Sequence, residues 1–166
     1  MLCIDYASPC IDAETYQKLL AMCFPLCDRV SFTRHILPYI PNKLQHELSP
    51  FLQKEIITTH WFSYITTENN PLNILLFPVN ADTIAIIKDQ TDALFPVSAY
   101  DNSGARNEIL EDLCLFSEGR LLLGTVSHEG VCHIYPPDAD FEAKLSELYP
   151  HWKKADDFDQ VNLNNY

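Results

Sequence analysis

Apolar residues recur every three or four positions in several stretches of the chain, which is the spacing of one buried helix face. The clearest stripe, 16–23, follows Asp12, a typical N-cap, and Pro25 should end this helix. A second stripe, 42–56, opens on a capping-box spacing, and Ser49-Pro50 can split it. The stretches that we predict to be helical are 12–23, 42–56, 81–90, 105–113 and 138–152. The pattern of 81–90 fits a helix or a strand, and a cap at Asn80 or Asp82 favours the helix; Asp138 should cap the last helix.

Other stretches alternate between apolar and polar residues or are rich in β-branched and aromatic residues, as strands are. The predicted strands are 29–33, 58–66, 73–79, 114–117, 120–126 and 131–135. Short glycine-containing turns, Glu118-Gly119 and 127–130, separate the last three, which predicts a β-meander. Because 121–123 is three consecutive leucines, the middle strand is apolar on both faces, and something must cover each face.

Together these elements predict an α+β fold, with helices packed on an antiparallel sheet of about five strands. Its C-terminal part should be the three-stranded meander followed by a helix. The 166 residues are enough for one hydrophobic core without disulfides or metal. We expect a single globular domain over 1–155, and a loose acidic tail over 156–166, where no basic residue occurs.

The charge of the chain narrows its range of partners. It has 23 acidic and 11 basic residues, a net charge of −12, and residues 101–166 hold 13 acidic and 5 basic residues. Direct binding to nucleic acid is disfavoured, because that affinity comes mostly from lysine and arginine replacing counterions. The excess charge serves either solubility or the recognition of a basic partner, and solubility is the simpler explanation.

Six cysteines do not indicate disulfides in this chain, because the N-terminal residues lack the basic and apolar regions of an export signal. We interpret the cysteines as buried thiols of the core. The longest apolar runs, 74–79 and 121–123, are much shorter than a membrane-spanning helix. The sequence therefore predicts a cytoplasmic protein that does not bind a membrane.

Catalytic and metal-binding patterns are weak. The four glycines never take a phosphate-binding spacing, so we expect no nucleotide cofactor. Potential zinc ligands occur, but a proline interrupts the first pair and adjacent strand residues point to opposite faces, so we predict no metal site. These zinc candidates are Cys23, Cys27, His128, Cys132 and His133.

Nucleophilic and acid-base chemistry has few candidates. Ser127-His128-Glu129 is best explained as a polar turn, because catalytic triads are assembled from separate elements. Cys132 with His60 or His128 as base is conceivable, although its apolar neighbours favour a buried and inert thiol. The carboxylate pair Glu111-Asp112 is predicted to lie on a helix surface.

Acidic and aromatic residues alternate near the C-terminus, a combination that interfaces with basic partners use. The predicted partner-binding residues are Asp138, Asp140, Glu142, Glu147, Asp156, Asp157, Asp159 and Tyr166. Glu108, Glu111 and Asp112 could extend this face. We expect Phe141, Leu145, Leu148 and Trp152 to be core residues of the same helix.

The favoured interpretation is an acidic binding or inhibitor protein without catalytic residues or cofactor. Its profile is that of an immunity (antitoxin-like) protein, which neutralises a basic partner, such as a nuclease toxin, by covering the active cleft. Mimicry of DNA by the same face is an alternative use. The alternative class is a small cytosolic enzyme, or an accessory subunit of one, that uses Cys/His chemistry.

Overall fold

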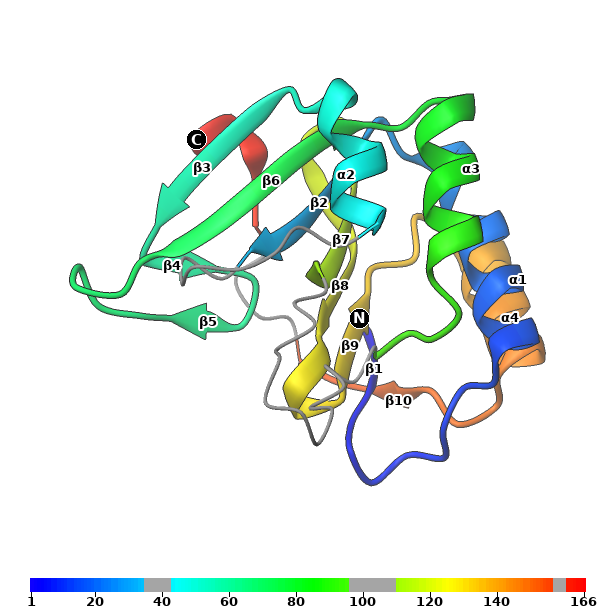
Figure 1. Ribbon diagram of the computed structural model, residues 1–166. Helices are drawn as coiled ribbons and strands as arrows, with labels where there is room; N and C mark the ends of the chain where they lie inside the picture. Colours follow the sequence, from blue (N-terminus) through cyan, green and yellow to red (C-terminus); the bar gives the residue numbers. More distant parts are fainter. Residues whose placement is uncertain (35–42, 96–109, 157–160) are drawn as a thin grey trace, which may run out of the picture.

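The computed structural model describes residues 1–34, 43–95, 110–156 and 161–166. An eight-stranded sheet, entirely antiparallel and in the order β10-β1-β9-β8-β7-β2-β6-β3, crosses the molecule (Figure 1). Its strands are β1 Leu2–Ile4, β2 Arg29–Arg34, β3 Lys54–Thr58, β6 Leu72–Pro78, β7 Glu111–Ser117, β8 Arg120–Val126, β9 Val131–Ile134 and β10 Lys153–Lys154. Strands β4 His60–Trp61 and β5 Tyr64–Ile65 form a separate hairpin. The predicted α+β class and antiparallel sheet are confirmed.

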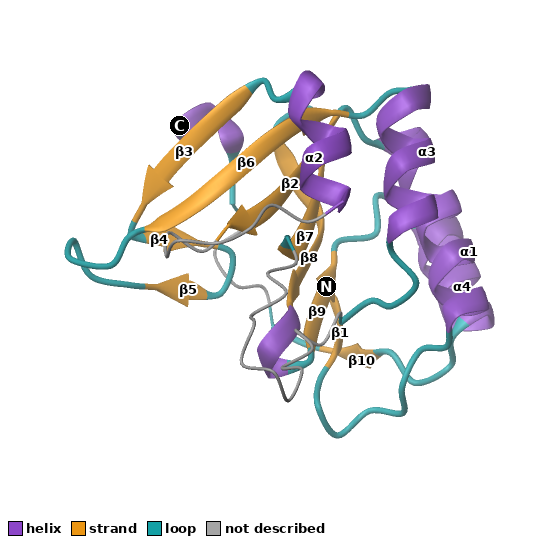
Figure 2. Ribbon diagram, viewed as in Figure 1, coloured by secondary structure: helices purple, strands orange, loops and turns teal. Residues whose placement is uncertain are grey.

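Among the described residues, four α-helices gather on one side of the sheet (Figure 2). They are α1 Ala13–Cys23, α2 Lys43–Leu48, α3 Ala81–Gln90 and α4 Ala139–Leu148. Short 3-10 turns also occur: η1 Phe24–Leu26, η2 Ser49–Phe51, η3 Ser127–Glu129 and η4 Leu163–Asn165. Side-chain caps begin three helices, because Asp12, Asn80 and Asp138 each accept hydrogen bonds from backbone N–H groups of the first turn. The cap of α3 is thus Asn80 and not Asp82.

The two faces of the sheet bury two different hydrophobic clusters. The larger cluster lies under the helices and includes Leu19 and Leu20 of α1, Ile87 of α3 and Leu145 of α4. The smaller cluster lies on the opposite face, where the β4–β5 hairpin and the C-terminal residues cover it. The middle strand of the meander, β8, contributes to both clusters, which explains its three consecutive leucines.

Close packing of the hairpin depends on Gly124 in β8. A Cβ atom at this position would lie 2.8 Å from the ring of Phe62, so only glycine leaves room for the phenylalanine. The Phe62 ring also meets the ring of His133 edge to face, with centroids 5.2 Å apart.

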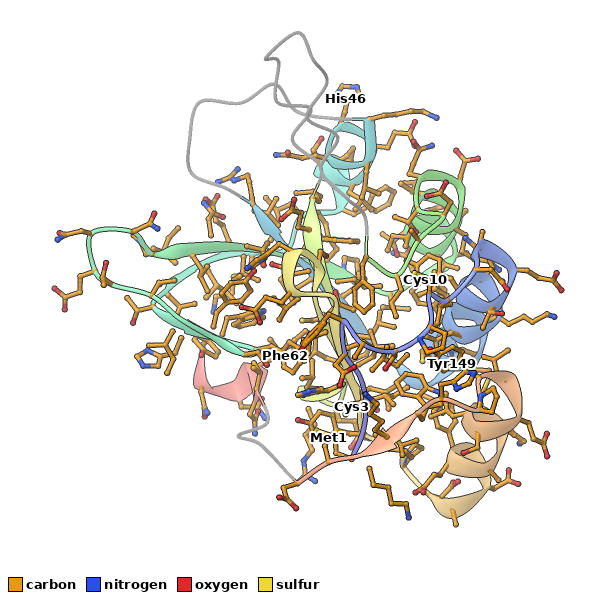
Figure 3. All side chains as sticks on the ribbon, turned by 90° about the horizontal axis from the view of Figure 1, so that it is seen from below. Met1, Cys3, Cys10, His46, Phe62 and Tyr149 are labelled. Atoms are coloured by element: carbon orange, nitrogen blue, oxygen red, sulfur yellow. The ribbon has the colours of Figure 1, made fainter. Side chains whose placement is uncertain are left out.

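Figure 3 shows Phe62 on the hairpin side of the molecule, whereas Cys10 and Tyr149 lie together near α1 and α4.

Residues 161–166 of the predicted loose tail lie against the smaller cluster. The backbone N–H of Leu121 donates to the Val161 carbonyl, and the N–H of Leu163 donates to the Gly119 carbonyl. Val161 is buried, and its side chain belongs to the smaller hydrophobic cluster. The C-terminal residues therefore act as part of the layer that covers this face.

Some of the predicted elements are wrong. The sheet has eight strands rather than five, because β1 and β10 have three and two residues and are too short to leave a pattern. Ile56 belongs to β3 and not to a helix, and Glu111–Leu113 open β7 where a helix was predicted over 105–113. In both places a spacing of only a few apolar residues fits either structure, and pairing with neighbouring strands decides.

Candidate functional site

A polar cluster lies on the hairpin side of the sheet, where β7 begins. Glu111 and Asp112 open this strand and are 8 % and 2 % exposed, so both carboxylates are buried. His128 comes from the η3 turn between β8 and β9 and is exposed. Ligand atoms of these three side chains all lie within 4.8 Å of one another. The fold thus brings together residues 16 positions apart in the sequence.

Backbone irregularity positions the cluster. The pairing of β7 with β2 shifts in register between Ser31 and Thr33, and Asp112 has a φ of 57°. Aspartate is one of the few residues that adopt this left-handed conformation readily. Asp112 and Ser127 then bind each other reciprocally: the N–H of Ser127 donates to Asp112 Oδ1 (2.7 Å), and the N–H of Asp112 donates to Ser127 Oγ (3.1 Å). This pair fixes the η3 turn, and His128 with it, beside β7.

Tyr64 of the β4–β5 hairpin contacts both Asp112 and His128. Its hydroxyl donates to Asp112 Oδ2 at 3.0 Å and lies 2.8 Å from His128 Nδ1. A phenol has only one proton to donate. When Tyr64 donates it to Asp112, the hydrogen bond to His128 must run the other way, with His128 Nδ1–H donating to the phenol oxygen. The neutral imidazole then keeps its lone pair on Nε2, which lies 3.9 Å from a carboxylate oxygen of Glu129.

The cluster concentrates negative charge in a poorly solvated place. Burial raises the pKa of Asp112, the hydrogen bonds from Ser127 and Tyr64 lower it, and the neighbouring Glu111 raises it again. Burial, followed by the charge of Asp112, raises the pKa of Tyr64, so its phenol stays protonated and remains a donor. A positive charge at this place would be stabilised by both carboxylates.

A cavity of about 410 Å³ lies between the hairpin and the C-terminal residues. Its lining residues are His60, Trp61, Phe62, Ser63, Tyr64, Ile65, Val161, Asn162, Asn165 and Tyr166. The lining is aromatic with a few amide and hydroxyl groups. Tyr64 is common to this cavity and to the polar cluster, so the two features are neighbours on the hairpin side of the sheet.

The thiols are poor candidates for chemistry. All six cysteines are free; Cys23, Cys114 and Cys132 are buried as expected, but Cys10 is exposed, so the prediction of a core position is wrong there. Burial raises the pKa of Cys132 well above its ordinary value and that of Cys114 to about 12. Neither thiol forms the reactive thiolate at neutral pH. His60 is exposed on β4, where its Nδ1 lies 2.9 Å from Thr59 Oγ1.

Most of the predicted partner-binding acids that the structure describes lie on or beside α4. Asp138, Asp140, Glu147 and Asp156 are exposed. Glu142 is half-buried, with a carboxylate oxygen 3.3 Å from Lys154 Nζ. Phe141 and Leu145 are buried in the core, as predicted for the apolar side of this helix. Asp157 and Asp159 lie outside the described residues, and so does Glu108.

Tyr166 and the β7 acids are not part of that face. Tyr166 packs on Trp61, with ring centroids 5.2 Å apart, and its hydroxyl donates to the His60 carbonyl at 2.9 Å. Trp61 belongs to the cluster on the hairpin side of the sheet, whereas α4 packs on the other side. Glu111 and Asp112 are buried, so the proposed extension of the exposed face through them is wrong.

Comparison of the chain with protein-family models, with curated proteins and with solved structures found no match. In the parts of the chain that the structure describes, no helix is both long and apolar enough to cross a membrane. Inference about function therefore depends on the exposed acids of α4 and on the polar cluster around Asp112.

Sequence reasoning missed this cluster because it assigned Glu111 and Asp112 to a helix surface. The turn at 127–130 was predicted correctly as a connection between strands. Had the strand 114–117 been extended back to Glu111, antiparallel pairing across the meander would have placed its first residues opposite the turn that carries His128. Recognising that Glu111 and Asp112 continue the strand would therefore have revealed the site from the sequence.

Proposed function

We propose that this protein is a cytoplasmic immunity (antitoxin-like) protein. It binds a basic protein partner, such as a nuclease toxin, through the exposed acidic face of α4 and covers the active cleft of that partner. The observation that carries the proposal is the arrangement of charge on α4. Asp140, Lys144 and Glu147 follow one another at helical spacing along its solvent side, and the Lys144 ammonium group is ion-paired with Asp140, so the carboxylate of Glu147 stays uncompensated on α4.

The field around Lys144 supports this proposal. A hydrogen bond from its ammonium group to Asp140 (2.7 Å) is the main cause of the raised pKa of Lys144, and the charges of Asp140, Asp138 and Glu147 raise it further. The surface of α4 therefore has an excess of negative potential even where a lysine is present. A cationic cleft that holds phosphates matches such a surface, which speeds association at low salt.

Neighbouring elements add to the acidic character of this side. Helices α1 and α4 pack against each other, and the Tyr149 hydroxyl, just after α4, donates to the Pro9 carbonyl, just before α1 (Figure 1). The helices are therefore antiparallel. The exposed Asp12 and Glu14 at the beginning of α1 lie at the same end as Glu147, which widens the surface offered to a basic partner.

The enzyme alternative has less support. Its nucleophile candidate, Cys132, is fully buried, and burial keeps its thiol protonated. Alkylation of the native protein with iodoacetamide, followed by mass spectrometry, separates the two classes. The binding proposal expects Cys132 to react far more slowly than the exposed Cys10. Fast modification of Cys132 in the folded protein would favour the enzyme.

For the direct test, we predict that a gene beside that of this chain encodes a basic protein, and that protein is the binding probe. We expect tight binding, measured by biolayer interferometry, and inhibition of any nuclease activity of that partner. Affinity should fall steeply from low to high salt, because attraction between exposed charges is screened over about 10 Å at 0.1 M salt. The variant D140K/E147K/D156K should bind at least ~100-fold more weakly at low salt.

A matched control separates a local effect from a change in net charge. The variant D82K/D89K/D92K reverses three exposed acids at α3, so its net charge equals that of the first variant. The proposal expects this control to retain nearly the affinity of the unmodified protein. Equal loss in both variants would indicate a nonspecific charge effect, and no loss in D140K/E147K/D156K would refute the acidic face.

A further inference from the structure

We propose that Glu111, Asp112 and His128 bind a divalent metal ion of the Mn²⁺ or Zn²⁺ class between β7 and the η3 turn. This site goes beyond the proposed function. It lies on the hairpin side of the sheet, and none of its ligands belongs to the acidic face of α4.

Distances between the donors suit a metal ion. Ligand atoms of the three side chains lie within 4.8 Å of one another. An ion held at about 2.0–2.4 Å by each donor keeps its donors at most about 4–4.8 Å apart. Binding therefore requires only small movements of these side chains. The buried backbone of β7 holds two of the donors, so little conformational entropy would be lost on binding.

The donor types select the class of ion. Two carboxylates and one imidazole form a mixed oxygen and nitrogen set; carboxylates suit Mn²⁺, and imidazole suits Zn²⁺. The Tyr64 hydroxyl, at 3.0 Å from Asp112 and 2.8 Å from His128, adds a neutral oxygen beside the cluster. None of these three ligands is a thiol, so the cluster has no preference for soft metal ions. A dication would offset the mutual repulsion of the two buried carboxylates.

An independent observation is the hydroxyl of Thr33. It is 3 % exposed, and its Oγ1 has no hydrogen-bond partner within the residues that the structure describes. Thr33 is the register partner of Glu111 across the β2–β7 ladder, and directly opposed residues of an antiparallel pair project from the same face of the sheet. The buried Thr33 hydroxyl therefore lies on the same face of the sheet as Glu111, and water bound to a metal ion on that face would give it a hydrogen-bond partner.

Titration of the chelator-treated full chain with Mn²⁺, followed by electron paramagnetic resonance of the free ion, tests the site. We expect one bound equivalent. His128→Gln and Asp112→Asn should each weaken Mn²⁺ binding at least ~10-fold. Zn²⁺ is measured by competition with a chromophoric chelator in a C10S background, which removes the exposed thiol. The matched control is His60→Gln, an exposed histidine on β4, and it should leave the affinity unchanged.

A second readout does not depend on Asp112→Asn folding normally. Because His128 is exposed, its replacement should leave the fold intact. Mn²⁺ at saturating concentration should raise the unfolding temperature of the unmodified protein, but not that of His128→Gln. Binding weaker than millimolar for both ions, or unchanged affinity in both site variants, would overturn the proposal. Tighter binding of Mg²⁺ or Ca²⁺ than of Mn²⁺ would overturn the assigned class of ion.

Discussion

Carboxylates occur in two contrasting regions of this molecule, on the surface of α4 and at the buried start of β7. On α4, Asp140 and Glu147 lie in water, and their charge is screened within about a Debye length. On β7, Glu111 and Asp112 are almost completely buried, next to a tyrosine and a histidine. Under our two proposals, the same side-chain chemistry would serve long-range attraction of a partner in one region and close-range coordination of an ion in the other.

The difference shows why a net charge does not define a surface. All four of these residues contribute to the negative charge of 101–166, but only the α4 residues face solvent. An exposed acid can change with little effect on folding, whereas a buried one needs partners for every oxygen. Mutations in the two regions should consequently differ in size and in kind.

The largest difference in stability is expected between Asp112→Ala and Glu147→Ala. Removing the Asp112 carboxylate leaves the Ser127 N–H and the Tyr64 hydroxyl without their acceptor, and alanine tolerates a positive φ poorly. We expect a loss of about 2–4 kcal/mol in the free energy of unfolding in urea. Glu147→Ala should change it by less than about 0.5 kcal/mol.

Asp112→Asn is the control for this prediction. Asparagine keeps an oxygen that can accept the bond from Ser127 and tolerates the left-handed backbone, so the loss should be smaller than for alanine. Equal losses of unfolding free energy for Asp112→Ala and Glu147→Ala would show that burial of Asp112 does not make its carboxylate more important for stability. The contrast between the two regions would then be wrong.

Packing of the hairpin that carries Tyr64 is the second most sensitive feature. In Gly124→Ala, the new methyl group would lie 2.8 Å from the Phe62 ring, so the hairpin must shift. We expect a loss of about 1–3 kcal/mol, measured by urea unfolding. Phe62→Leu combined with Gly124→Ala should lose less than the sum of the two single variants. Strict additivity would show that this contact does not hold the hairpin.

Much of the fold could be predicted from the sequence, because several elements carry long and consistent patterns. The stripe on α1, the cap of α4 and the glycine turns of the meander each agree with the structure. Prediction failed where the pattern was short. Ile56 and Leu113 satisfy a helical spacing with only a few neighbours. Ile56 instead pairs with Ile74 of β6, and the strand that holds Leu113 pairs with β2, far earlier in the chain.

The candidate site could be predicted only in part. The exposed acids of α4 follow from the apolar stripe of Phe141 and Leu145, which fixes the opposite side of the helix in solvent. The cluster around Asp112 depends on a register shift and on a contact from Tyr64, 48 positions earlier in the chain. No local pattern encodes such a contact.

The third prediction concerns the link between the hairpin and the cluster. Tyr64→Phe removes the hydroxyl that contacts both Asp112 and His128 while keeping the ring. We expect a loss of about 0.5–1.5 kcal/mol in the free energy of unfolding. Tyr6→Phe is the matched control, because Tyr6 is 87 % exposed, and it should have no measurable effect. Identical stability of the two variants would contradict a structural role for this hydroxyl.

The smallest expected effect belongs to Asp5, a half-buried carboxylate with a partner at the surface. A hydrogen bond from Lys153 is the main cause that lowers the pKa of Asp5, with help from Ser8 and the Ala7 N–H. A lowered pKa in the folded state adds stability above the usual carboxyl range, and that stability is lost as pH falls through the folded-state pKa.

Asp5→Asn should therefore be slightly less stable than the unmodified protein at pH 7, and the difference should vanish in acid. Chemical unfolding measured from pH 7 down to about pH 3 tests this, at low salt where the pair is least screened. A constant difference across this range would mean that the ion pair with Lys153 does not contribute, and that hydrogen bonds alone hold Asp5.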